Sequence, residues 1–241
     1  MTRAFAFAVL VLCFVPFGAL ASTYADLIRS QESGGNYGAL NSQGGTAAGA
    51  YQITAGTLAS LGYVRHTGGS RGSWANYEWT DAARSQGVNS LSDFLNSSSG
   101  HSLQDRAFGE LTDRNLSSLS SQTLGLAGQT INGVTFTQEG LLTAAHFLGA
   151  GALNEWVASG MDPTVFPQEY LTANGFSSYE ELQAHLLNRI GAASGTSYAG
   201  GYGTGGTYPG TDGFPGFGAK RPVLIRETPP FQGERATLGV N

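Results

Sequence analysis

The fold of this chain is decided by residues 23–53, TYADLIRSQESGGNYGALNSQGGTAAGAYQI. Thr23 begins a helix-capping signature, and apolar residues then recur at helical spacing up to Glu32. The glycines after Glu32 end this helix, and residues 38–48 are too rich in Gly, Ser and Asn to form anything but a loop. Order returns just before Thr54, which can cap a second short helix. The sequence therefore predicts two helices joined by a loop, with Glu32 at the end of the first.

Three later helices are predicted from their capping residues. Ser102 precedes one apolar stripe, Thr137 opens an alanine-rich helix that we expect to be central, and Ser178 begins a capping box for the last helix. Asn132-Gly133, flanked by β-branched residues, is the strongest short hairpin signal. These patterns predict a mainly α fold of five or six helices, with at most a small β-hairpin and a cleft built from loops.

Residues 64–90 have weak helical patterning. Trp74, Tyr77 and Trp79 stand there among Gly, Ser and Arg, which indicates an irregular excursion. The three aromatic side chains would suit a saccharide groove, whereas a place in the hydrophobic core is the commoner use of clustered aromatics.

The first 21 residues have the features of a signal peptide. Arg3 gives a positive start, residues 4–18 form a short apolar run, and Ala19-Leu20-Ala21 is the small-x-small pattern of a cleavage site. The run is shorter than the roughly 20 apolar residues of a membrane-spanning helix. We therefore expect export to the periplasm or the extracellular space, with Ser22 as the new N-terminus and no integral membrane segment after cleavage.

Residues 22–193 are expected to form one folded domain. They contain seven Lys/Arg and fourteen Asp/Glu, a formal balance of −7 that repels phosphate backbones and argues against nucleic-acid binding. The only cysteine, Cys13, lies in the apolar run, so the mature chain has no disulfide or thiolate chemistry. The four histidines lack metal-site spacing, and no phosphate loop is present. We expect neither a metal nor another cofactor.

The last 48 residues, 194–241, change character. They hold 12 of the 36 glycines and five of the eight prolines. Such a composition buries too little apolar surface to offset the entropy of ordering. We expect a flexible tail that serves as a plain tether or as an arm that binds a protein partner.

Glu32 is the first candidate for chemistry. A carboxylate at the end of an apolar-faced helix, followed by a glycine turn, can be partly desolvated and still reachable. Desolvation raises the pKa of a carboxyl group and keeps its proton on, as a general acid requires. On spacing alone, a solvated surface glutamate is the commoner interpretation.

Two motifs here resemble those of a known group. Glu32-Ser33 with Asn36, followed by Gly-Ala-Tyr-Gln-Ile at residues 49–53, resembles the Glu-Ser-x-x-Asn … Gly-x-x-Gln-Ile pattern of soluble lytic transglycosylases and goose-type lysozymes. A third motif of that group, Ala-Tyr-Asn-x-Gly on a buried helix, has a counterpart in Ala-His-Phe-Leu-Gly at residues 145–149. The resemblance covers these segments and none of the tail.

The resemblance implies an exported enzyme with a lysozyme-like helical fold that cleaves peptidoglycan glycan strands between N-acetylmuramic acid and N-acetylglucosamine. Glu32 would be its single acid/base. Ser33 would shape the surroundings of the acid, and Gln52 would position the substrate. Tyr51 would stack on a sugar ring, although a core role is an equal alternative. His146 would hydrogen-bond near Glu32, with a satisfied interior histidine as the alternative.

Two reaction outcomes follow from the same acid. In a transglycosylase the sugar's own 6-hydroxyl attacks and leaves a 1,6-anhydro end, whereas in a muramidase water attacks. An inverting hydrolase needs a second carboxylate at roughly 6.5–9.5 Å. Glu78, Asp81 and Glu139 are candidates, none of them in a recognisable motif. The sequence therefore favours a transglycosylase.

Three residues depart from the pattern of the group. Tyr37 replaces the usual proline after Asn36, His146 stands where Tyr is expected, and Phe147 stands where Asn is expected. Since a fold does not fix a function, a cell-wall-binding or assembly protein that has lost catalysis is the alternative.

Overall fold

The computed structural model describes the backbone of residues 17–41 and 45–198, with side chains from Tyr24 onward. Residues 1–16 of the expected signal peptide and residues 199–241 of the expected tail lie outside the described residues. The first helix, α1 (Phe17–Ser33), ends one residue after Glu32, close to the predicted end. Its predicted start at Thr23 is wrong, because the helix already begins at Phe17.

The described part of the chain is mainly α-helical, as predicted, but with ten α-helices rather than five or six. After α1 the helices are α2 (Ala55–Ser60), α3 (Asp81–Arg84), α4 (Leu91–Asn96), α5 (Ser98–Ser118), α6 (Ser121–Leu124), α7 (Gln138–Leu148), α8 (Ala150–Ala158), α9 (Gln168–Asn174) and α10 (Tyr179–Ala192). Two 3₁₀ turns are η1 (Trp74–Asn76) and η2 (Pro163–Val165).

Two small antiparallel sheets complete the described fold. One pairs β3 (Thr130–Ile131) with β4 (Val134–Thr135) around the predicted Asn-Gly turn. The other pairs β1 (Val64–His66) with β2 (Tyr77–Trp79), inside the segment predicted to be irregular. The prediction of irregular structure is therefore wrong for these two strands. The sequence does not reveal them because each is only three residues long and a Gly-rich connection without a hairpin signature separates them.

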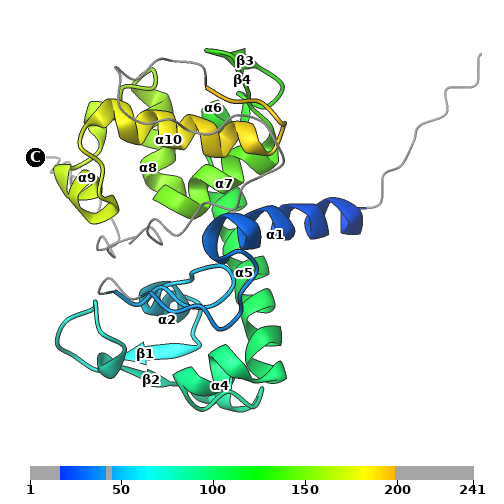
Figure 1. The fold of residues 1–241 in the computed structure, drawn as a ribbon, viewed down its shortest axis with the longest axis vertical. Coiled ribbons are helices and arrows are strands. Elements are labelled where there is room, and N and C mark those ends of the chain that lie inside the picture. The colour runs from blue at the N-terminus through cyan, green and yellow to red at the C-terminus, as the bar shows by residue number, and fades with distance from the viewer. Residues whose placement is uncertain (1–16, 42–44, 199–241) are drawn as a thin grey trace, which may run out of the picture.

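The long helix α5 connects two groups of elements (Figure 1). α2, α4 and the β1–β2 hairpin surround its N-terminal half, whereas α6 to α10 and the β3–β4 hairpin gather at the other end. α1 lies across the middle, where the two groups meet (Figure 1). The end of α1, and with it Glu32, is thereby placed between them.

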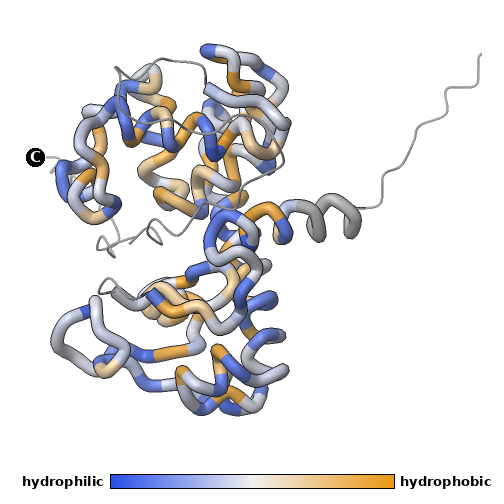
Figure 2. The backbone as a smooth tube through the Cα atoms, in the orientation of Figure 1, coloured by the Kyte–Doolittle hydropathy of each residue, from blue (hydrophilic) through white to orange (hydrophobic). Residues whose placement is uncertain are grey.

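Apolar and polar residues alternate along these elements (Figure 2), and the buried apolar ones form the hydrophobic core. Every residue of α7 from Gly140 to Leu148 is buried, which confirms the prediction that this helix is central. Trp156 of α8 and Leu186 of α10 are fully buried beside it. Burying side chains of this size stabilises the fold by about 1.5–3 kcal/mol each.

The predicted caps are mostly confirmed. The side chains of Thr54, Thr137 and Ser178 each accept a hydrogen bond from a backbone N–H in the first turn of α2, α7 and α10. Ser102 is not a cap, because Ser97 starts α5 five residues earlier and accepts a hydrogen bond from the N–H of Gly100 at 2.9 Å.

The first residues of the expected tail are attached to the folded domain. Ser194 Oγ donates to the carbonyl of Thr135 at 2.9 Å, and the N–H of Thr135 donates to Thr196 Oγ1 at 3.0 Å. The N–H of Tyr198 donates to Asn188 Oδ1 at 2.9 Å. Residues 194–198 are therefore hydrogen-bonded to the folded part of the chain that precedes them. No helix in the described ranges is both long and apolar enough to cross a membrane.

Candidate functional site around Glu32

A side-chain hydrogen bond joins the two predicted motifs. Ser33 Oγ donates to the carbonyl of Ala50 at 2.8 Å, so the end of α1 is fastened to the Gly49–Ile53 turn. Ala48 pairs with Ile53 on one side and with Leu40 on the other, which brings the two described ends of the loop together. Ser33 therefore lies at the junction of the two motifs, and its role in shaping the surroundings of Glu32 stays a prediction.

The Gly49–Ile53 turn needs its glycine. Gly49 has φ +80°, and a Cβ there would lie 2.1 Å from Gln104 Oε1. That oxygen accepts the N–H of Ala50 at 2.7 Å, while Gln104 Nε2 donates to the carbonyls of Phe94 and Tyr37. One buried amide of α5 therefore holds the turn, and the glycine lets the backbone approach it.

Gln52 lies in an unusual conformation in this turn. It has φ +49° without being a glycine, a conformation that costs free energy and concentrates at functional sites. Its Nε2 donates to the carbonyl of Gly49 at 2.9 Å, whereas its buried Oε1 makes no hydrogen bond with any described residue. An unpartnered buried acceptor is suited to a donor supplied by water or by a substrate hydroxyl.

Glu32 forms an ion pair with Arg189 of α10. Their side chains are only 9% and 6% exposed, respectively. Burial on its own would raise the pKa of Glu32, but the guanidinium of Arg189, together with His146 and His185, lowers this pKa below its ordinary value. The expectation of a raised pKa at Glu32 is therefore wrong for the protein without ligand, because the sequence did not reveal the cation beside it.

Phe147 explains how Arg189 is held. The guanidinium carbon of Arg189 lies 4.9 Å from the centre of the Phe147 ring, in a cation–π arrangement. The phenylalanine that departs from the family pattern thus contacts the cation that pairs with Glu32. His185, one turn before Arg189 on α10, packs its ring at 5.1 Å from the same phenylalanine.

His146 connects α7 to the motif turn. Its Nε2 lies 3.0 Å from the carbonyl of Tyr51, and because a carbonyl only accepts, Nε2 carries the hydrogen. Burial lowers the pKa of His146, with Glu32 opposing the shift and Arg189 adding to it. A neutral ring with its proton on Nε2 leaves Nδ1 as an acceptor. The hydrogen-bond partner of His146 is thus the carbonyl of Tyr51, as the alternative of a satisfied interior histidine implies, and its interaction with Glu32 is electrostatic.

Tyr51 belongs to the core. Its ring stacks on Phe108 at a centroid distance of 4.1 Å and is 2% exposed, while its hydroxyl donates to Asp105 at 2.7 Å. A ring covered in this way has no free face for a sugar, so the prediction of a stacking role is wrong and the core alternative holds. Tyr51 contributes to the site through its backbone carbonyl.

The predicted aromatic excursion belongs largely to the hydrophobic core of the domain. Tyr77 and Trp79 are buried, and of the three aromatic residues only Trp74, stacked on Trp79 at 6.0 Å, remains partly exposed.

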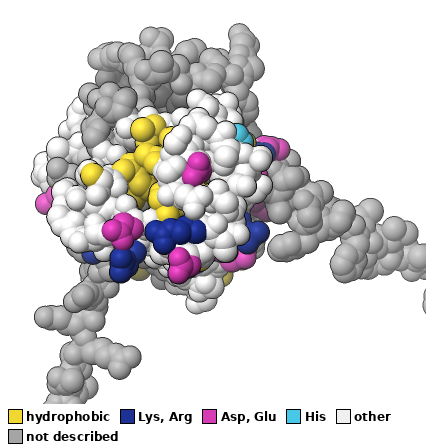
Figure 3. Space-filling view, turned by 90° about the horizontal axis from the view of Figure 1, so that it is seen from below, with side chains coloured by type: hydrophobic (Ala, Val, Ile, Leu, Met, Phe, Trp, Pro, Cys, Tyr) yellow, Lys and Arg dark blue, Asp and Glu magenta, His cyan; other side chains and the backbone are white. Residues whose placement is uncertain are grey.

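Figure 3 shows the molecule from below, where hydrophobic side chains form a short strip bordered by basic and acidic ones. Two of the candidate second carboxylates are engaged elsewhere, Glu78 with Arg65 and Asp81 with Arg84.

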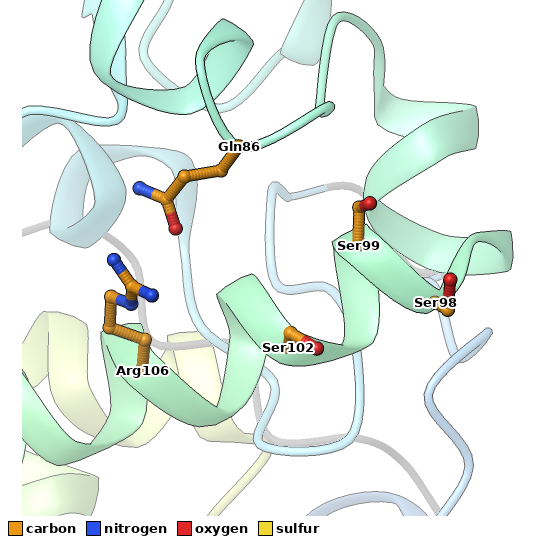
Figure 4. A pocket seen from close by; sticks show the side chains of 5 residues that line it. All are labelled: Gln86, Ser98, Ser99, Ser102 and Arg106. Carbon is orange, nitrogen blue, oxygen red and sulfur yellow. The ribbon is translucent and has the colours of Figure 1, made fainter.

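A shallow hollow of about 320 Å³ lies on another part of the surface. It is lined by Ser98, Ser99 and Ser102 along α5, with Gln86 and Arg106 extending toward the same space (Figure 4). None of the residues in contact with Glu32 lines it. Within the described ranges, no group of three His, Cys, Asp or Glu side chains is arranged to hold a metal ion.

Sequence reasoning missed Arg189 and His185. One signal was present, because Arg189 lies three residues after Leu186 and seven after Leu182, on the apolar face of its helix. A cation on a buried face requires a partner. Which carboxylate pairs with Arg189 could not be read from the sequence, since Glu32 is 157 residues away.

Comparison with protein-family models, with curated proteins and with solved structures gives no match to this chain.

Proposed function

We propose that this chain is an exported enzyme that cleaves the β-1,4 bond between N-acetylmuramic acid and N-acetylglucosamine in peptidoglycan, with Glu32 as its acid/base. The supporting observation is the hydrogen bond from Ser33 to Ala50, which joins the two motifs of the resemblance beside a nearly buried carboxylate. The mainly helical fold is compatible with the lysozyme-like architecture that the resemblance implies.

In the proposed reaction, protonated Glu32 gives its proton to the glycosidic oxygen as the bond from C1 of the muramic acid to that oxygen breaks. The carboxylate then takes the proton of the attacking hydroxyl as a new C1–O bond forms, which restores the acid. A 6-hydroxyl from the same sugar gives the 1,6-anhydro product, and water gives a reducing end. Glu78 and Asp81 pair with surface arginines, which leaves Glu139 in the first turn of α7 as the remaining candidate for the second carboxylate of an inverting hydrolysis.

Glu32→Gln tests the proposal, because glutamine keeps the shape and removes the transferable proton. Wild-type protein should clear purified peptidoglycan, and the variant should lose at least about 100-fold of that activity, the usual contribution of a general acid. Glu78→Gln, in an exposed pair, is the matched control and should remain active. Mass spectrometry separates anhydro ends from reducing ends. Full activity in a folded Glu32→Gln protein would refute the assignment.

A second candidate is a cell-wall-binding protein without turnover. The Arg189–Glu32 pair favours it, because a carboxylate held by a guanidinium cannot donate a proton, and Phe147 stabilises that arrangement. Glycan binding without product at every pH from 4 to 8 would support this candidate and exclude the enzyme.

A further inference from the structure

Arg189 has unused hydrogen-bonding capacity. One terminal nitrogen donates to Glu32, whereas the buried Nε finds no acceptor among the described residues. The whole residue is 5% exposed. A guanidinium carries five N–H donors in a rigid fork, and leaving one of them buried without a partner is costly. The arrangement is therefore incomplete as it stands, and an oxygen acceptor would complete it.

The position of this guanidinium is well defined. Phe147 lies under its face at 4.9 Å. α10 lies so close to α7 that a Cβ on Gly140 would be 2.5 Å from the carbonyl oxygen of Ile190, the residue next to Arg189. Close backbone packing and a ring contact thus fix the site from which the fork presents its donors.

Of the groups that face Glu32, the guanidinium of Arg189 on α10 is the cation that keeps it ionised. Burial lowers the pKa of His185 on α10 and of His146 on α7, so both rings are neutral near pH 7. From α1, Tyr24 contributes a hydroxyl whose pKa is raised by burial, with Glu32 and Glu139 adding to that shift. Of these groups Arg189 has the largest effect on Glu32. A proton can therefore return to Glu32 only if Arg189 is drawn to another acceptor.

We propose that Arg189 is a positioning residue that pairs with Glu32 in the free protein and exchanges it for an oxygen acceptor of the bound glycan. Glu32 then remains in a desolvated place without its cation and takes up one proton from solvent, which makes it the acid that the reaction needs. Substrate binding and protonation of Glu32 thus occur together. This role of Arg189 rests on the proposed peptidoglycan-cleaving function.

Two groups of the glycan carry a suitable acceptor. Acetamido carbonyls occur on both sugars, whereas a carboxylate occurs only on the lactyl and peptide substituents of the muramic acid. Two disaccharides separate these sources: diacetylchitobiose has the carbonyls alone, and N-acetylglucosaminyl-β-1,4-N-acetylmuramic acid has both groups. Neither contains the bond that the enzyme would cut, so both can be titrated without turnover.

The test is calorimetric titration at pH 6 in buffers of different ionisation enthalpy, which counts the protons taken up on binding. Wild-type protein should take up close to one proton per ligand, and Glu32→Gln none. Arg189→Met, whose Glu32 has no cation to lose, should take up clearly less than wild type, and Arg189→Lys should lie between. Arg65→Met, which breaks an exposed pair, is the control and should match wild type. Uptake with both sugars assigns the carbonyl, and uptake with the muramic acid sugar alone assigns the carboxylate.

Binding of both disaccharides with equal proton counts in wild type and Glu32→Gln would overturn the exchange, while cleavage of peptidoglycan would keep the proposed function intact. If neither disaccharide binds, the pH profile of cleavage decides. The basic limb of kcat reports Glu32 in the complex, and that of kcat/KM reports it in the free enzyme. We expect the kcat limb at higher pH, and Arg189→Met should move the kcat/KM limb toward it. Coincident limbs in wild type would reject the exchange, whereas absence of both binding and cleavage would reject the function itself.

Discussion

Two arginine–carboxylate pairs in this protein have the same chemistry in opposite surroundings. Arg65 and Glu78 face each other across the β1–β2 hairpin at 2.7 Å with 73% and 56% of their side chains exposed. Arg189 and Glu32 meet between α10 and α1 with 6% and 9% exposed. Water screens the first pair, whereas the second loses hydration and interacts at a low effective dielectric constant. The comparison shows that burial, not pairing, makes one of these carboxylates a candidate for chemistry.

The buried pair should give the largest effect. Arg189→Met leaves Glu32 as a buried carboxylate without a cation, so we expect the free energy of unfolding at pH 7 to fall by about 3–5 kcal/mol. Urea unfolding of purified protein measures it. Combining Arg189→Met with Glu32→Gln should recover part of the loss, because the unpaired charge is gone. A single variant as stable as wild type would show that the pair is open to water.

Acid stability should be governed by the same region. Burial lowers the pKa of His185 from 6.5 to about 3 in the folded protein. A lowered pKa means that the unfolded chain binds the proton first, so this contribution to stability is complete above pH 6.5 and is lost as the pH falls toward 3. His185→Phe should reduce the slope of stability against pH by up to about 1.4 kcal/mol per pH unit in this window.

The ionisation of Glu32 also contributes to the pH dependence of stability, at lower pH than His185. Because its pKa is lowered from 4.5, its stabilising contribution is complete above pH 4.5 and is lost as the pH falls below that value. Wild type and His185→Phe should therefore diverge from pH 6.5 down toward pH 3, and a Glu32-dependent decline common to both should add to this below pH 4.5. Parallel curves over the whole range would mean that the His185 ring is hydrated. Thermal unfolding at half-unit pH steps distinguishes these outcomes.

Helix packing behind the buried pair gives the next effect. A Cβ on Gly140 would lie 2.5 Å from the carbonyl oxygen of Ile190, so Gly140→Ala must move α10 from α7 and should destabilise the protein by about 1–3 kcal/mol. Gly109 on α5 has open space around it. Gly109→Ala is the matched control and should stabilise by about 0.5–1 kcal/mol. Denaturant midpoints that shift in the same direction for both variants would contradict the close contact.

The sequence predicts local structure better than it predicts which distant residues contact each other. Thr54, Thr137 and Ser178 were predicted as caps because a cap and the N–H groups it serves lie within three residues. The resemblance of the two motifs around Glu32 and Gln52 can be seen in the sequence because short patterns carry their spacing with them, and the link to that group stays a prediction. The β1–β2 hairpin was missed because its strands pair across a long connection without a turn signature.

The chemistry of the site depends on contacts that no local pattern encodes. The histidine and phenylalanine of the third motif looked like defects beside the family pattern, yet His146 donates to the carbonyl of Tyr51 and Phe147 lies under Arg189. Both observations needed the packing of α7 against α10 and the motif turn. The direction of the pKa shift at Glu32 was predicted incorrectly for the same reason, since it is set by a residue 157 positions away.

Substitutions in the exposed Arg65–Glu78 pair should have the smallest effect on stability. Arg65→Met and Glu78→Gln should each change the free energy of unfolding by less than about 1 kcal/mol, and their double-mutant coupling should be similarly small. Raising the salt from 0.1 M, where the screening length is about 10 Å, to about 1 M should remove that coupling. The Arg189–Glu32 coupling should survive the same change because little water or salt reaches it. Coupling energies that fall equally at both sites would place Glu32 in solvent and remove the physical reason for assigning it the catalytic proton.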